Sequence, residues 1–138
     1  MDKRIKLEIK LPLVKDIELV AIEGLELMGR HLQISDEKIG EARILVTEGV
    51  INALEHSETA APYIDVHFIM NVEALTIIIT DYGKGFDPAI IENPEISKKI
   101  NSDYKRGWGL KLMKEMSDDF RVDSGKNGTK ITITKNLR

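Results

Sequence analysis

Hydrophobic and polar residues alternate along several short stretches of the chain, which is the pattern of half-buried β-strands. From Lys3 to Leu11, isoleucine or leucine fills every second position from Ile5 onward, with charged residues between. Two such stretches, Tyr63–Met70 and Leu75–Thr80, are joined by only four residues, Asn71–Ala74, so they are expected to form a hairpin. The further predicted strands are Phe120–Asp123 and Thr129–Lys135.

Apolar residues at helical spacing predict helices over Val14–Leu32, Asp36–Ser57 and Leu110–Ser117. Ser35 or Asp36 can cap the second helix, and Gly29 is expected to mark the fraying end of the first. The second helix has one apolar face and, on the opposite side, a stripe of polar residues. The apolar face holds Ile39, Ala42, Val46, Val50 and Ala53, and the polar stripe holds Glu41, Glu48, Asn52 and Glu55.

Strands with one apolar face and helices with one apolar face are satisfied together by a two-layer α+β fold. The expected sheet is mixed and mostly antiparallel, with about three helices on one face. The length of 138 residues fits a single domain, residues 1–138, and a hydrophobic fraction of 42% suffices for a core.

The composition narrows the classes of function. A net charge of −3, with acids and bases mixed along the chain, gives no support for a nucleic-acid or membrane partner. The absence of cysteine excludes disulfides and thiolate metal sites, and the three histidines do not have the spacing of a zinc motif. Without a signal peptide or an apolar run of about 18 residues, a soluble cytoplasmic protein is expected.

Candidate chemistry begins on the second predicted helix. Glu48 and Asn52 are four residues apart, so their side chains point toward the same place. A carboxylate and a carboxamide placed together could supply a proton acceptor beside a hard cation. An isolated pair of this kind is most often just a charged helix face. The motifs further along the chain favour a binding site instead.

Three glycine-rich places follow: Asp81-x-Gly83-x-Gly85, Gly107-x-Gly109 and Gly128-Thr129. Asp81 has the parity of the inward apolar residues before it, so it is either a turn residue or a buried recognition carboxylate. The second pair is expected to open a helix, where free backbone N–H groups favour phosphate. Ala89–Lys105, about 17 residues, is expected to be an irregular lid. Neither the G-x-x-x-x-G-K-[ST] loop nor an early G-x-G-x-x-G is present.

Taken in order, these pieces resemble the Bergerat-fold (GHKL) ATPases, which include gyrase, histidine kinases and the mismatch-repair ATPases. Glu48-x-x-x-Asn52-Ala53-x-x-His56 matches their N box, and Asp81-x-Gly83-x-Gly85 their first glycine box. Arg106-Gly107-x-Gly109-Leu110 matches the second glycine box, and Gly128-Thr129 the last. The resemblance covers about Ile39 to Ile133. Within this group the chain looks like the anti-sigma factor serine kinases of the SpoIIAB/RsbW type, which are short domains with a leading strand and helix.

The resemblance implies ATP and Mg²⁺ as cofactors and a role for each matching residue. Glu48 would be the general base toward a serine hydroxyl, and Asn52 would ligate Mg²⁺. Asp81, with Thr129 beside it, would bind the adenine amino group. The remaining nucleotide-binding residues would be Gly83 and Gly85 under the base, Gly128 in the last glycine box, Gly107, Trp108, Gly109 and Leu110 around the phosphates, and either Lys105 or Arg106 at the γ-phosphate.

The implied function is a serine/threonine kinase that phosphorylates an antagonist protein and binds a sigma factor or other regulator. The family also suggests a homodimer, and Lys3–Leu32 is the expected contact surface. Two alternatives stay open. One is a nucleotide-switched binding module without transfer, and the other is a histidine-kinase catalytic domain acting in trans.

Overall fold

The computed structural model describes residues 3–57, 61–92 and 101–138. Its strands and helices follow the predicted order, with one additional short helix after the third strand. The strands are β1 (Ile5–Pro12), β2 (Tyr63–Met70), β3 (Ala74–Asp81), β4 (Asp119–Gly125) and β5 (Gly128–Asn136). The helices are α1 (Glu18–His31), α2 (Asp36–His56), α3 (Ala89–Glu92) and α4 (Asn101–Met116).

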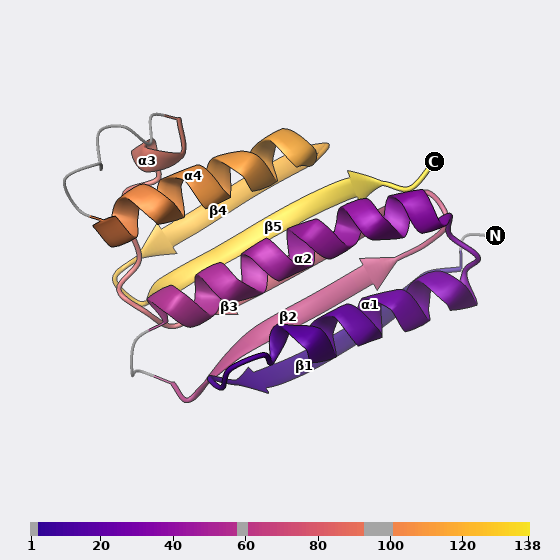
Figure 1. Ribbon diagram of the computed structural model, residues 1–138, viewed down its shortest axis with the longest axis horizontal. Coiled ribbons are helices and arrows are strands. Elements are labelled where there is room, and N and C mark those ends of the chain that lie inside the picture. Colours follow the sequence, from indigo (N-terminus) through magenta and orange to yellow (C-terminus); the bar gives the residue numbers. More distant parts are fainter. Residues whose placement is uncertain (1–2, 58–60, 93–100) are drawn as a thin grey trace.

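The five strands form one sheet in the order β1-β2-β3-β5-β4, and every neighbouring pair is antiparallel. Helices α1, α2 and α4 lie side by side over one face of this sheet (Figure 1). The predicted two-layer α+β fold is therefore confirmed, but the sheet is not mixed as expected, because all four strand pairs are antiparallel. The strand pairing between β3 and β5 places Asp81 opposite Thr129.

The core lies between the sheet and the helices. Along β2 and β3 every second side chain is buried, as the alternation in the sequence predicts. These inward residues include Phe68, Leu75 and Ile77, each fully buried. None of the described helices is both long and apolar enough to cross a membrane.

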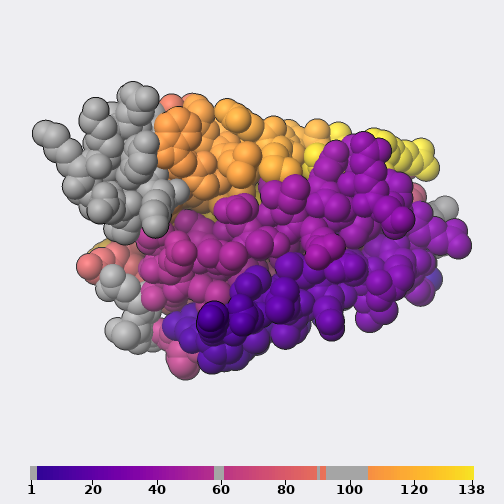
Figure 2. Space-filling model, viewed as in Figure 1, coloured from indigo at the N-terminus to yellow at the C-terminus, as the bar shows by residue number. Residues whose placement is uncertain are grey.

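Helix α2 is the central helix, enclosed between α1 and α4 (Figures 1 and 2). Because α1, α4 and the sheet all contact α2, this helix buries a wider part of its surface than one apolar stripe. Asn52, which the sequence places on the polar stripe opposite the apolar face, is buried, with an exposed fraction of only 7%. Glu48 is half-buried, whereas Glu55 is exposed as expected.

Glycines let the helices approach their neighbours closely. A Cβ atom on Gly49 of α2 would lie 2.4 Å from Ile79 Cδ1 on β3, and one on Gly29 would lie 2.4 Å from Ile39 Cδ1 on α2. Gly29 therefore does not mark a fraying end, because α1 continues to His31 and packs against α2 there. The predicted start of this helix, Val14, is four residues too early, since Asp16 has a φ of +67° and the helix begins at Glu18.

Two predictions about helix boundaries concern the site. Ser35 caps α2 as predicted, with its hydroxyl accepting a hydrogen bond from the Lys38 N–H at 3.3 Å. The prediction that a helix opens at Gly107-x-Gly109 is wrong, because α4 begins at Asn101. Ala89–Lys105 is accordingly not irregular throughout: α3 and the start of α4 occupy its two ends, and residues 93–100 lie outside the described residues.

Candidate functional site

Asp81 lies at the end of β3 and is buried, with an exposed fraction of 2%. One carboxylate oxygen, Oδ1, accepts a hydrogen bond from the Gly83 N–H at 3.0 Å. Burial raises the pKa of this carboxyl above its ordinary value, while the Gly83 N–H and the charges of Arg106 and His56 act in the opposite direction. Of the two interpretations left open by the sequence, the structure supports a buried carboxylate rather than a simple turn residue.

A hydroxyl pair lies beside Asp81. Ser124 Oγ is 2.8 Å from Thr129 Oγ1 and also accepts a hydrogen bond from the Phe86 N–H at 2.9 Å. Ser124 thereby fixes the loop after β3 against the β4–β5 hairpin. Sequence reasoning missed both Ser124 and Phe86. The pairing of Ser124 with Thr129 across this hairpin was the signal that could have revealed Ser124.

Arg106 reaches from α4 into the same place. Its Nη2 atom is 3.5 Å from Asp81 Oδ2 and 3.5 Å from Thr129 Oγ1, and its guanidinium carbon is 4.1 Å from the centre of the Phe86 ring. The side chain is only 4% exposed. The guanidinium therefore belongs to the Asp81 pocket in this state. The side chain of Lys105, the other candidate for the γ-phosphate, lies outside the described residues.

Two glycines shape the loops around this pocket. Gly128 has a φ of +132°, and a Cβ atom there would lie 2.1 Å from the Asp81 carbonyl oxygen. Gly85 has a φ of +77°, and its Cβ would lie 2.2 Å from the Gly125 carbonyl oxygen. Side chains are excluded at both positions by conformation and by space, since L-residues rarely adopt such φ values.

Helix α2 supplies the other wall of the site. Glu48 faces α4 where Gly109 leaves room: a Cβ atom on Gly109 would lie 4.0 Å from Glu48 Oε2. One turn further along, the Nδ2 atom of buried Asn52 has no hydrogen-bond partner. His56 is one more turn along and acts electrostatically on Asp81. The structure thus brings the N-box residues and the glycine-box residues to one end of the α2–α4 layer.

The second glycine box is helical in this state. Gly107 and Leu110 are buried on the inner side of α4, whereas Trp108 is 42% exposed. Inside an α-helix each backbone N–H donates to the carbonyl four residues earlier. The N–H groups of Gly107 and Gly109 are therefore not presented at a helix start, and a phosphate cradle built from them requires a local change of backbone.

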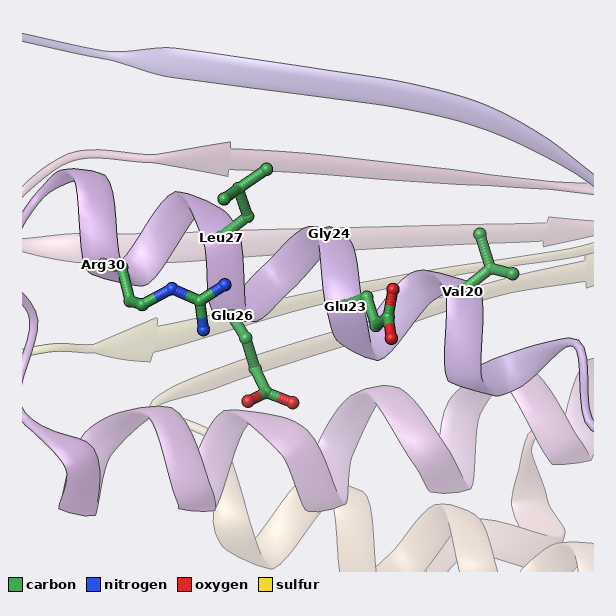
Figure 3. A pocket seen from close by; sticks show the side chains of 6 residues that line it. All are labelled: Val20, Glu23, Gly24, Glu26, Leu27 and Arg30. Atoms are coloured by element: carbon green, nitrogen blue, oxygen red, sulfur yellow. The ribbon is translucent and has the colours of Figure 1, made fainter.

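Three of the hollows on the surface of the described residues lie on elements that matter for the site or for a partner. One adjoins Asp81, Gly128 and Thr129, and another adjoins Glu48 on the outer side of α2, beside Gly40 and Ile44. The third lies on α1, away from the glycine boxes (Figure 3). It is lined by Val20, Glu23, Gly24, Glu26, Leu27 and Arg30.

The sequence of this chain matches a known protein family and several known proteins. Residues 15–135 match the family described as the histidine kinase-like ATPase domain. The serine-protein kinase RsbW of Staphylococcus aureus, from strains that include MW2 and Newman, is 28% identical over 109 residues. That alignment covers 74% of this chain and 68% of the relative.

Solved structures show the same fold. The structure of the RsbU and RsbW domains of a Mycobacterium tuberculosis protein matches 96% of this chain with a TM-score of 0.71 and 18% identity, and this chain spans 32% of that one. The histidine kinase domain of a blue-light activated kinase from Erythrobacter litoralis matches 99% of this chain, and 68% of its own, with a TM-score of 0.50 and 17% identity. The chain belongs to the histidine kinase-like ATPase domain family, the GHKL group, and within it is similar to the RsbW serine-protein kinases.

Proposed function

We propose that this chain is an ATP-binding protein serine/threonine kinase of the anti-sigma factor type. The observation that carries the proposal is the buried Asp81 carboxylate, held opposite Thr129 at one end of a site whose other wall bears Glu48 and Asn52. The matching family and the RsbW relatives support the same assignment.

Asp81 and Thr129 are suited to bind an adenine base. An ionised carboxylate only accepts hydrogen bonds, so it matches the exocyclic amine of adenine. Gly83, whose N–H donates to this carboxylate, and Gly85 carry no side chain into the loop after β3, and at Gly128 a Cβ atom would meet the Asp81 carbonyl oxygen. A purine bound here would lie against Phe86, whose ring already faces a planar group.

The phosphates would lie between α2 and the second glycine box, Gly107, Trp108, Gly109 and Leu110, with Lys105 or Arg106 near the γ-phosphate. Asn52 would hold magnesium through its carboxamide oxygen. The side chain is buried, and its Nδ2 atom, which has no hydrogen-bond partner, could donate to a phosphate oxygen. Among the described residues no cluster of three or more His, Cys, Asp or Glu side chains could hold a metal. Magnesium binds through one or two protein oxygens plus phosphate oxygens and water, and when bound would neutralise the phosphate charge.

Glu48 is placed to act as the general base. Its carboxylate adjoins Gly109 and a surface hollow through which a serine could approach. In the proposed step the serine oxygen bonds to the γ-phosphorus, the bond from that phosphorus to the bridging oxygen breaks, and ADP leaves. Glu48 takes the hydroxyl proton.

The proposed substrate is a serine or threonine of a small antagonist protein, and a sigma factor or other regulator is the proposed binding partner. Homodimerisation and a cytoplasmic location belong to the same proposal. The exposed apolar side chains of α1, among them Leu19, Val20 and Leu27, make the N-terminal strand and helix the proposed contact surface.

Nucleotide binding is tested first, by calorimetric titration of ATP with and without Mg²⁺. Binding should require Mg²⁺ for full affinity, and Asn52→Ala should remove that dependence. Asp81→Asn should weaken binding of ATP while leaving binding of GTP, which lacks the 6-amino group, as weak as before. Absence of ATP binding by the wild-type chain would refute the proposal.

Transfer is tested with γ-labelled ATP and serine-containing candidate antagonists. Glu48→Gln should abolish label transfer while keeping ATP affinity, whereas Glu55→Gln, an exposed position on the same helix, should transfer normally. Acid-stable phosphoserine supports a serine kinase. Acid-labile product would instead indicate a histidine kinase acting in trans, and binding that changes between ATP and ADP without any phosphoprotein would indicate a switched binding module.

A further inference from the structure

The guanidinium of Arg106 fills the place that the proposed function assigns to adenine. It contacts Asp81 Oδ2 and Thr129 Oγ1, each at 3.5 Å, and lies 4.1 Å above the Phe86 ring. With an exposed fraction of 4%, the side chain is inside the pocket and not at its rim.

Guanidinium and adenine present similar chemistry to this pocket. Both are flat, both donate N–H groups from their edge, and both stack on aromatic rings. Asp81 Oδ1 accepts a hydrogen bond from the Gly83 N–H, and Arg106 contacts the other carboxylate oxygen, Oδ2. An adenine amine that contacts both Asp81 Oδ2 and Thr129 Oγ1 would have to lie where Nη2 lies, because Nη2 is 3.5 Å from each of these atoms. The two occupants therefore exclude each other.

The state of α4 supports the same conclusion. Arg106 is followed by the two glycines of the second glycine box, Gly107 and Gly109, and all three residues lie inside α4. While Arg106 stays in the base pocket, the adjoining backbone keeps its helical hydrogen bonds and offers no free N–H groups to phosphate. Two glycines within three residues weaken this part of α4 by about 1 kcal/mol each relative to alanine. Release of Arg106 and reshaping of the glycine box can therefore occur together.

We propose that Arg106 is an internal competitor of the nucleotide, which holds the base pocket in the ATP-free chain and must leave before adenine can bind. This inference rests on the proposed function, because it uses Asp81 and Thr129 as the base-binding pair. Once displaced, the Arg106 side chain is available to bind the phosphates of ATP. The same side chain would thus close the base pocket in the ATP-free chain and contact the phosphates in the ATP-bound chain.

Adenosine separates these two roles, because it carries the base without phosphates. The apparent affinity of a site that is mostly closed is reduced by the fraction that is open. A charge-assisted hydrogen bond in a buried pocket gives a reduction of roughly tenfold to a hundredfold. Arg106→Ala should therefore bind adenosine at least tenfold more tightly than the wild type, although its affinity for ATP gains less because a phosphate contact is lost.

Two controls accompany this titration. Arg121→Ala removes an arginine whose side chain is 79% exposed on β4, and it should leave adenosine affinity unchanged. In Arg106→Ala, added methylguanidinium should compete with adenosine, because it can enter the vacated pocket, whereas it should have little effect on adenosine binding to the wild type.

A measurement on the wild type covers the case in which Arg106→Ala does not fold. In ¹H–¹⁵N spectra the Arg106 side-chain N–H signal, assigned through its loss in Arg106→Lys, should be protected from exchange. Saturating adenosine should make it exchange as fast as that of Arg121. Equal adenosine affinity of wild type and Arg106→Ala, or an Arg106 signal that adenosine leaves unchanged while Gly83 shifts, would overturn the inference but not the proposed function. If neither chain binds ATP or adenosine, the proposed function itself fails, and the inference with it.

Discussion

Replacing Gly49 by alanine tests how closely α2, which carries Glu48 and Asn52, packs on the sheet that carries Asp81. Two effects oppose each other. Alanine favours a helix by about 1 kcal/mol relative to glycine. Its methyl group, however, would lie 2.4 Å from Ile79 Cδ1, far inside contact distance. Overpacking of this kind costs about 1–3 kcal/mol. Gly49→Ala should therefore leave stability unchanged or lower it by up to about 2 kcal/mol.

The structure also predicts which second change removes the clash. Ile79→Val deletes Cδ1 and by itself should cost about 0.5–1.5 kcal/mol. The remaining Cγ1 atom is 3.8 Å from the added methyl, and Met113 Sδ is 3.7 Å away, both ordinary contacts. In the valine background Gly49→Ala should consequently stabilise the protein by about 1 kcal/mol. The coupling between the two changes is then about 1–3 kcal/mol.

The assay is urea unfolding of the wild type, both single variants and the double variant, with a check that the m values agree. Gly40→Ala is the matched control on the same helix, because nothing lies within 4 Å of its added Cβ. It should stabilise the protein by about 1 kcal/mol in either background. If Gly49→Ala behaves like Gly40→Ala when Ile79 is intact, α2 does not pack on β3 as closely as described.

Two further predictions concern the Asp81 pocket. Because burial raises the folded-state pKa of Asp81, the folded chain holds this proton to a higher pH than the unfolded chain, and stability falls as the pH rises through that interval. Asp81→Asn cannot titrate, so urea unfolding at a series of pH values should show its stability relative to the wild type increasing from acid toward neutral pH; a constant difference would contradict the raised pKa. Gly128→Ala should lose about 3 kcal/mol or more, because its methyl would meet the Asp81 carbonyl oxygen at 2.1 Å with φ at +132°. Gly125→Ala, in the same hairpin and with nothing within 4 Å, should change little in the same measurement.

The alternation of apolar and polar residues along strands, and the helical spacing of apolar residues, predicted most of the fold. Alternation located β2 with its observed bounds, and it also placed Asp81 on the buried face, because parity along a strand decides which side each residue faces. Ser35 was identified as a candidate cap for a similar reason, since capping depends on residues next to each other in the chain.

The features that the sequence did not predict depend on contacts between segments far apart in the chain. Asn52 is polar and was assigned to a polar stripe, yet the folded chain buries it, which the helical period of α2 alone does not predict. Gly107 and Gly109 have low helix propensity and suggested a helix start, yet α4 extends five residues ahead of Arg106. Phe86 has no local pattern that distinguishes it, and its place in the site follows from its contacts with Arg106 and Ser124, which lie far from it in the sequence.

The pairing between β3 and β5 has a consequence for how the chain acquires its site. Strands β2 and β3 form one hairpin and β4 and β5 another, and Asp81 belongs to the first whereas Thr129 and Ser124 belong to the second. Neither hairpin alone contains the pocket, so a partly folded chain has no place for a ligand that needs both. A ligand that binds only the complete fold stabilises it by about 2.7 kcal/mol at a hundred times its dissociation constant. If the ligand is the nucleotide of the proposed function, its supply would thereby influence how long each molecule survives proteolysis.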